Sequence, residues 1–164
     1  MATKQSRQLH KHFMLLALDI GREAARQGET PVGAVVVKNG EVIGSGYNRV
    51  EIDNDPTAHG ELIALREACR TTGDWRLPGV TLYATLEPCV MCAAALIHAR
   101  VERVVFAARD IRWGGIGSLF DLSHDPRLNH HVEVVSGVME EEAAELLQGF
   151  FRGLRRAEDS RPNL

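Results

Sequence analysis

The chain has 164 residues, a length typical of one domain that is large enough to bury a real core. Hydrophobic residues make up 45% and charged residues 25%, which is ordinary for a soluble globular protein, and the 3 cysteines exclude an even disulfide framework. The formal net charge is −3, so binding to nucleic acid would require a local basic surface. We expect a single domain over residues 1–164, with ragged ends at about 1–7 and 157–164.

The N-terminal part predicts neither a targeting segment nor a membrane span. Its apolar run, Phe13–Leu18, is too short to cross a bilayer, and no cleavage site follows it. Apolar residues from Phe13 to Ala24 recur at helical spacing instead, and Gly28 is expected to end the helix. Cysteines without a disulfide framework indicate a reducing compartment, so we expect a cytoplasmic protein.

Two strand-like runs follow, Val32–Lys38 and Glu41–Tyr47, and Asn39-Gly40 joins them. Asn-Gly between such runs predicts a β-hairpin, because both residues tolerate the positive φ of a tight turn. The later expected elements are an irregular Asn48–Asp55, a helix at Leu62–Arg70, a strand at Val80–Thr85, a helix at Pro88–His98, a strand at Arg103–Ala108, a loop or short helices at Arg109–Asp125, a strand at Val132–Ser136 and a helix at Glu140–Arg156. This order predicts an α/β sheet with a hairpin first and crossovers afterward.

The segment Thr85–Cys92 leads from the end of a strand into a helix and carries two cysteines. Pro88 suits the first helical position, since its missing N–H costs no hydrogen bond there. Cys89 and Cys92 then share one face of the first turn, where the helix dipole favours thiolates that can chelate zinc. Such a pair is also compatible with a redox dithiol, half of a structural zinc site or two packed cysteines.

His59 and Glu61 lie upstream, at the expected start of another helix. Two helices that each begin after a strand can face each other at one end of a sheet, which would bring His59 near the two cysteines. Three protein ligands leave a fourth position for water, as in catalytic zinc sites, whereas structural zinc usually has four ligands. Residues i and i+2 do not share a helix face, so Glu61 is expected to carry protons rather than bind the metal.

The pattern His-x-Glu followed by Pro-Cys-x-x-Cys is the signature of zinc-dependent nucleobase deaminases. From about Phe13 to Arg156 the sequence resembles the cytidine-deaminase superfamily, and within it the bacterial tRNA-specific adenosine deaminases. The zinc motif is common to the superfamily, and further pieces narrow the resemblance. These pieces are Pro31–Ala34, Gly46–Arg49, Asp55–His59, Ala108–Asp110, Gly117–Leu119, Asn129–His130 and Phe150–Arg152.

The resemblance implies a three-layer α/β/α fold with a five-stranded mixed sheet, a homodimer, and one zinc ion per subunit. It implies deamination of the wobble adenosine to inosine in a tRNA anticodon stem-loop, and we expect no membrane or DNA partner. His59, Cys89 and Cys92 match the family's zinc ligands. Glu61 matches its proton shuttle, which serves a zinc-bound hydroxide. The matching substrate contacts are Asn48 for the flipped nucleoside, Asp110 and Arg112 in a loop, and Phe150, Phe151 and Arg152 near the C-terminus.

Two residues depart from the family's pattern. The family usually has alanine where this chain has Gly60, and His-Gly-Glu resembles the fungal cytosine deaminases, which act on a free base. Trp113 stands where the family tends to carry a small polar residue. A deaminase of a free nucleobase or nucleoside, of cytosine or guanine type, is therefore the alternative function, because it would share every zinc residue.

Two further classes explain less of the sequence. A non-catalytic zinc module would leave Glu61 without a role, and a dithiol oxidoreductase would leave both His59 and Glu61 unexplained. Arginines in the loop after residue 108 and at the C-terminus are either a local basic surface for RNA or ordinary solvated side chains.

Overall fold

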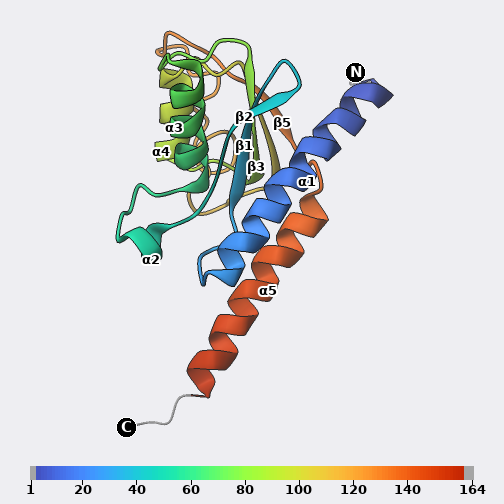
Figure 1. Cartoon of the computed structure of the whole chain (residues 1–164), viewed down its shortest axis with the longest axis vertical. Helices are drawn as coiled ribbons and strands as arrows, with labels where there is room; N and C mark the ends of the chain where they lie inside the picture. Colours follow the sequence, from blue (N-terminus) through green and yellow to red (C-terminus); the bar gives the residue numbers. More distant parts are fainter. Residues whose placement is uncertain (1–2, 161–164) are drawn as a thin grey trace.

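The structure, a computed structural model, describes residues 3–160. A five-stranded sheet in the order β2-β1-β3-β4-β5 lies between helices on both faces (Figure 1). The elements are α1 (Lys4–Arg26), β1 (Gly33–Lys38), β2 (Glu41–Tyr47), α2 (Val50–Asp53), α3 (Gly60–Thr72), β3 (Val80–Leu86), α4 (Val90–His98), β4 (Arg103–Ala108), β5 (Glu133–Ser136) and α5 (Glu140–Asp159). The predicted three-layer α/β/α fold is confirmed.

The sheet is mixed, as expected. β1 is antiparallel to both β2 and β3, whereas β4 is parallel to both β3 and β5. Asn39 and Gly40 have φ values of 52° and 80°, which confirms the predicted hairpin turn between β1 and β2. The parallel pairs require crossover connections, so the hairpin comes first and the crossovers follow.

The register places the starts of α3 and α4 at one edge of the sheet. Gly33 pairs with Tyr47 at the end of β2, and Ala34 pairs with Ala84 near the end of β3. The ends of β2 and β3 therefore flank the start of β1. Because α3 follows β2 and α4 follows β3, the N-termini of these two helices are brought to the same place.

Two hydrophobic clusters hold the layers together, one on each face of the sheet. Ala34 and Val36 of β1 pack in the cluster with α3 and α4, and Val35 and Val37 pack in the cluster with α1 and α5. A fully buried aliphatic side chain contributes about 1.5–3 kcal/mol. The first cluster therefore fixes α3 and α4 on the sheet, and with them the positions of their N-termini.

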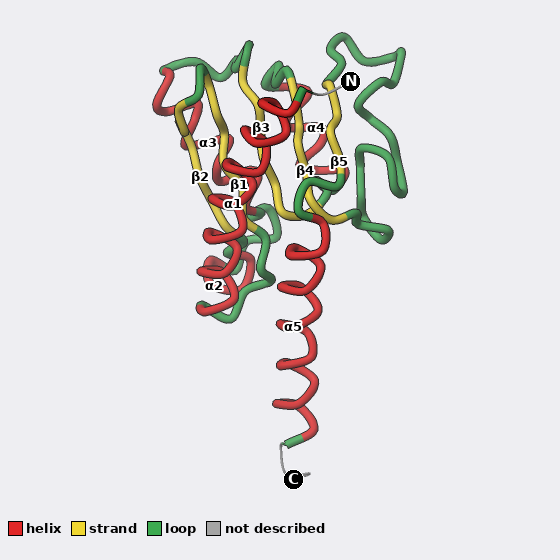
Figure 2. Tube along the Cα trace, turned by 90° about the vertical axis from the view of Figure 1, so that its right-hand side faces the viewer, coloured by secondary structure: helices red, strands yellow, loops and turns green. Residues whose placement is uncertain are grey.

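The helix α5 starts beside the sheet and extends well beyond it, as two perpendicular views show (Figures 1 and 2). Ala143 near its start is its buried residue, and the later turns are mostly exposed. Within residues 3–160, each helix is either too short or too polar to cross a bilayer.

Two sequence expectations need correction. The helix α4 begins at Val90 rather than Pro88, because Cys89 is still extended (φ −67°, ψ 171°) and serves as the N-cap. The Asn48–Asp55 segment contains the short helix α2. The Arg109–Asp125 segment, all of it described, forms turns and isolated bridges without a helix, which is the loop of its two expected forms.

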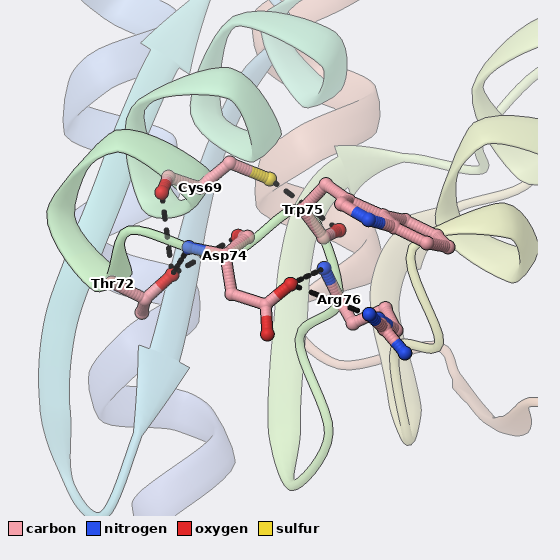
Figure 3. A network of polar contacts seen from close by, with 5 residues as sticks. All are labelled: Cys69, Thr72, Asp74, Trp75 and Arg76. Carbon is pink, nitrogen blue, oxygen red and sulfur yellow. Dashed lines mark hydrogen bonds and ion pairs between the residues drawn. The ribbon is translucent and has the colours of Figure 1, made fainter.

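The C-terminal end of α3 lies far along the helix from His59 and is held by local polar contacts (Figure 3). The Thr72 hydroxyl contacts the carbonyl oxygens of Cys69 and Asp74, and the Arg76 N–H donates to the Asp74 carboxylate at 3.0 Å. The Cys69 thiol lies 3.7 Å from the Trp75 carbonyl oxygen, and burial raises its pKa. Cys69 is half-buried at the edge of the core.

Candidate metal centre

The structure brings His59, Cys89 and Cys92 together at the shared edge. His59 is the N-cap of α3, Cys89 is the N-cap of α4, and Cys92 lies in the first turn of α4. The three donor atoms all lie within 4.8 Å of one another. The Nδ1 atom of His59 is 3.6 Å from the Cys89 Sγ and 3.5 Å from the Cys92 Sγ.

These distances suit a tetrahedral zinc ion. Zinc–sulfur and zinc–nitrogen bonds of about 2.3 and 2.0 Å place sulfur and nitrogen ligands about 3.5 Å apart in a tetrahedron. One imidazole and two thiols are also the borderline-soft donors that zinc prefers. Contact with the Cys92 thiol lowers the pKa of Cys89 to about 4, and the neighbouring His59 acts in the same direction. The residues present therefore fit zinc.

Glu61 is the second residue of α3 and is only 3% exposed. Burial raises the pKa of its carboxyl group to about 7. Its Oε2 atom is buried and has no hydrogen-bond partner among the described residues. A carboxyl group that titrates near neutral pH and keeps an oxygen unpaired can both accept and donate a proton.

A cavity of about 740 Å³ opens over these groups. Its lining is mostly apolar, with polar side chains at a few points, as in many small-molecule sites. The lining residues are Thr30, Val32, Asn48, Pro56, His59, Glu61, Leu86, Glu87, Cys89, Val90, Met91, Asp110 and Trp113. The Asn48 side-chain oxygen accepts the Gly60 N–H at 3.0 Å, so Asn48 is held directly against the start of α3.

A second cavity of about 760 Å³ shares a wall with the first. The shared residues are Thr30, Leu86, Asp110 and Trp113. Its other lining residues are Arg112 from the loop after β4 and Leu147, Gln148, Phe151, Arg152 and Arg155 from α5. The two cavities together connect the metal-compatible group to the exposed part of α5.

The sequence-predicted substrate contacts are distributed over both cavities. Asn48 lines the first, Asp110 lines both, and Arg112 and Arg152 line the second. Phe151 is 42% exposed and also lines the second cavity. Phe150 is half-buried, packs edge-on against Phe151 with ring centroids 5.4 Å apart, and is not among the lining residues.

Several lining residues were missed by sequence reasoning. Trp113 had been noted only as a departure from a pattern, yet it is 67% exposed and lines both cavities. On α5, Gln148 was also missed, and Arg155 was expected only as one of the C-terminal arginines that form either a basic surface for RNA or ordinary solvated side chains. The signal for them was present, because Gln148, Phe151, Arg152 and Arg155 follow i, i+3, i+4, i+7 spacing and therefore share one helix face.

Known proteins resemble this chain over most of its length. The family described as the cytidine and deoxycytidylate deaminase zinc-binding region matches residues 7–108. The tRNA-specific adenosine deaminase of Bacillus subtilis is 48% identical over 144 residues, which cover 88% of this chain and 89% of that relative.

Two solved structures are similar in fold and sequence. One comes from studies of A-to-I editing by tRNA:A34 deaminases at the wobble position of transfer RNA, with a TM-score of 0.80 and 46% identity over 83% of this chain and 99% of that chain. The second is NE0047 in complex with 2,6-diaminopurine, with a TM-score of 0.70 and 28% identity over 86% of this chain and 80% of that chain.

Proposed function

We propose that this chain, which belongs to the zinc-binding cytidine and deoxycytidylate deaminase family and within it to the tRNA-specific adenosine deaminases, converts the wobble adenosine of a tRNA anticodon to inosine. The chain is a zinc-dependent hydrolase of this family, with one zinc ion per subunit. The reaction consumes water and adenosine and releases ammonia and inosine.

One observation favours a polynucleotide over a free base. A free base would occupy only the cavity over His59 and Glu61, whereas the adjoining cavity carries three arginines, Arg112, Arg152 and Arg155. Guanidinium groups bind phosphate through paired N–H donors, so this second cavity suits the backbone and bases next to an extruded adenosine. The net charge of −3 is no obstacle, because these arginines are concentrated beside the catalytic cavity.

The proposed roles of the residues follow from their positions. His59, Cys89 and Cys92 would hold zinc, which supplies Lewis-acid activation of water at neutral pH. Glu61, through its unpaired Oε2, accepts a proton from the attacking water and passes it to the ring nitrogen beside C6. Glu61 then accepts the proton of the hydroxyl group added at C6 and delivers it to the amino group, which leaves as ammonia while the C6 carbonyl of inosine forms. Asn48, anchored through Gly60, presents its amide to the nucleoside.

The alternative is a deaminase of a free purine or cytosine. Gly60 favours it, as does the 28% identity to NE0047, whose structure holds 2,6-diaminopurine. The deciding experiment offers the zinc-loaded protein an anticodon stem-loop with a wobble adenosine, and separately cytosine, guanine and adenosine, and measures ammonia release. We expect release from the stem-loop, whereas efficient release from cytosine or guanine with an inert stem-loop would favour the alternative.

We further propose that the single deaminase domain works as a homodimer in the cytoplasm, where tRNA is modified and thiols stay reduced. The support for this proposal is an apolar groove between α3 and α4, lined in part by Leu65, Trp75 and Ala95. Trp75 is 54% exposed, and we propose that a second copy of the chain covers it. Sedimentation of the parent and of Trp75→Glu tests this: a dimer that the substitution dissociates supports the proposal, and a monomeric parent contradicts it.

A further inference from the structure

Glu87 is a buried charged residue whose role the proposed reaction does not require. It lies between the end of β3 and Pro88 and is only 1% exposed. Its side chain does not approach a cation: among the described residues, no ion pair includes it. A buried carboxylate is costly unless hydrogen bonds compensate it, so its partners indicate what it is for.

All of these partners belong to the loop that follows β4. The Oε2 atom accepts the Asp110 N–H at 3.1 Å and the Ser118 hydroxyl. The Oε1 atom accepts the N–H groups of Ile116 and Ser118 at 3.3 and 3.0 Å. One carboxylate therefore holds both ends of the Asp110–Ser118 segment, which we call the clamp loop.

The clamp loop also packs directly, backbone against backbone, on the segment Pro88–Val90, which contains Cys89 and which we call the cysteine turn. The Val90 N–H donates to the Trp113 carbonyl oxygen at 3.2 Å, and the Gly115 N–H donates to the Pro88 carbonyl oxygen at 2.9 Å. A Cβ atom on Gly114 would lie 2.6 Å from the Glu87 Oε1, and one on Gly115 would lie 2.8 Å from the Val90 Cα. Glycine is thus required at both positions.

We propose that Glu87 is a positioning residue that fixes the clamp loop on the cysteine turn and so holds Asp110 and Trp113 in the wall between the two cavities. This inference rests on the proposed function, since it assigns the wall to the binding of the anticodon loop. A loop that is already ordered binds its substrate without a further cost in conformational entropy. Glu87 therefore lowers the KM for RNA, although it does not touch the reacting atoms.

The substitution Glu87→Gln tests the carboxylate with little change in shape. The glutamine amide has one acceptor oxygen, so its NH2 group must take the place of either Oε1 or Oε2 of Glu87. In either place it faces N–H or O–H donors of the clamp loop. The least unfavourable choice puts the nitrogen at the Oε2 position, where the Ser118 hydroxyl can turn to accept from it. The Asp110 N–H then has no acceptor, and the first part of the clamp loop is released.

The experiment measures loop motion and kinetics in the zinc-loaded protein. In a Trp75→Phe background Trp113 is the remaining tryptophan, since the chain has 2, and its fluorescence anisotropy decay reports motion of the clamp loop. Glu29→Gln is the matched control, because Glu29 is also buried (2% exposed) but accepts the Ile52 N–H outside the clamp loop. KM and kcat for the stem-loop are expressed per bound zinc.

We expect Glu87→Gln to add fast motion to Trp113 and to raise KM roughly tenfold, the lower end of what supporting contacts around metal sites contribute, with kcat and zinc content near parental values. Glu29→Gln should change neither the anisotropy nor KM. Parental anisotropy and KM in Glu87→Gln would overturn the proposal and leave Glu87 a purely structural residue.

If Glu87→Gln does not fold, Ser118→Ala decides, because it removes one of the four donors: faster Trp113 motion with a raised KM supports the proposal, and parental values overturn it. If the parent does not deaminate the stem-loop, the proposed function fails, and the anisotropy comparison of Glu87→Gln with Glu29→Gln still tests whether Glu87 holds the clamp loop.

Discussion

Replacing Gly60 by alanine is expected to destabilise the protein, even though relatives of this family usually carry alanine there. The first turn of α3 lies directly on the backbone of β1 and β2. A Cβ on Gly60 would be 3.1 Å from both the Tyr47 Cα and the Val32 carbonyl oxygen, and 3.2 Å from the Gly46 carbonyl oxygen. Backbone atoms cannot rotate away as side chains can, so the strands must shift by a few tenths of an ångström.

The expected loss of stability in Gly60→Ala is the difference between two opposing effects, a better helix propensity and an overpacked site. Alanine is better than glycine by up to about 1 kcal/mol in a helix interior and by less in the first turn. Overpacking a tightly filled site costs about 1–3 kcal/mol. We expect Gly60→Ala to lower the free energy of unfolding by about 1 kcal/mol. Gly46→Ala should cost more, about 3 kcal/mol, because its Cβ would lie 2.7 Å from the Gly60 carbonyl oxygen and 2.8 Å from the Ala64 N.

Urea unfolding of the zinc-loaded proteins, followed by circular dichroism, measures these differences at a constant m value. Gly149→Ala in α5 is the open-space control, because a Cβ there meets nothing within 4 Å and alanine should not destabilise. A Gly60→Ala protein as stable as the parent, or more stable, would refute the close approach of β2 to α3. Zinc content and activity per zinc should stay within a few-fold of the parent, since the expected shift is small.

Three other predictions concern catalysis, RNA binding and pH. Glu61→Gln should keep zinc and lose turnover by at least about 100-fold, the usual lower bound for acid–base assistance, and zinc loss equal to that of Cys89→Ala would show that Glu61 also binds metal. Arg112→Ala and Arg152→Ala should each weaken stem-loop binding and reduce its salt slope by roughly one, and unchanged slopes would contradict a phosphate-binding second cavity. Burial lowers the pKa of His10 below its unfolded value, so its contribution to stability is present above about pH 6.5 and lost as pH falls through the folded-state pKa. The melting temperature of His10→Gln should therefore fall less than that of the parent when the pH is lowered from 7 to 5.

The sequence predicted the elements best where the signal is local. Glu41–Tyr47 and Arg103–Ala108 are strands with the predicted bounds: the Asn39-Gly40 turn marks the start of the first, and the apolar residues that follow Arg103 define the second. The helix α2 was missed because a contact distant in the sequence stabilises it: the Glu29 carboxylate accepts the Ile52 N–H at 2.8 Å. The order of the strands also depends on distant pairing, and the sequence did not predict it; the family resemblance implied only the five-stranded mixed sheet.

At the site, the proximity of His59, Cys89 and Cys92 was predicted from two short motifs at helix starts, and the structure brings them together. The start of α4 was misplaced because proline favours the first helical position, whereas here the chain stays extended to let Pro88 accept the Gly115 N–H. The wall that separates the two cavities was beyond sequence reasoning, since buried contacts between separate loops hold it.

The most direct test of the account is to locate the product base. A full-length tRNA with adenosine at the wobble position is incubated with the zinc-loaded protein, digested with ribonuclease, and its fragments are weighed by mass spectrometry. We expect inosine at the wobble position, approaching one per tRNA, and none when the Glu61→Gln protein is used. Unchanged tRNA from a zinc-loaded parent that deaminates cytosine or guanine would contradict it.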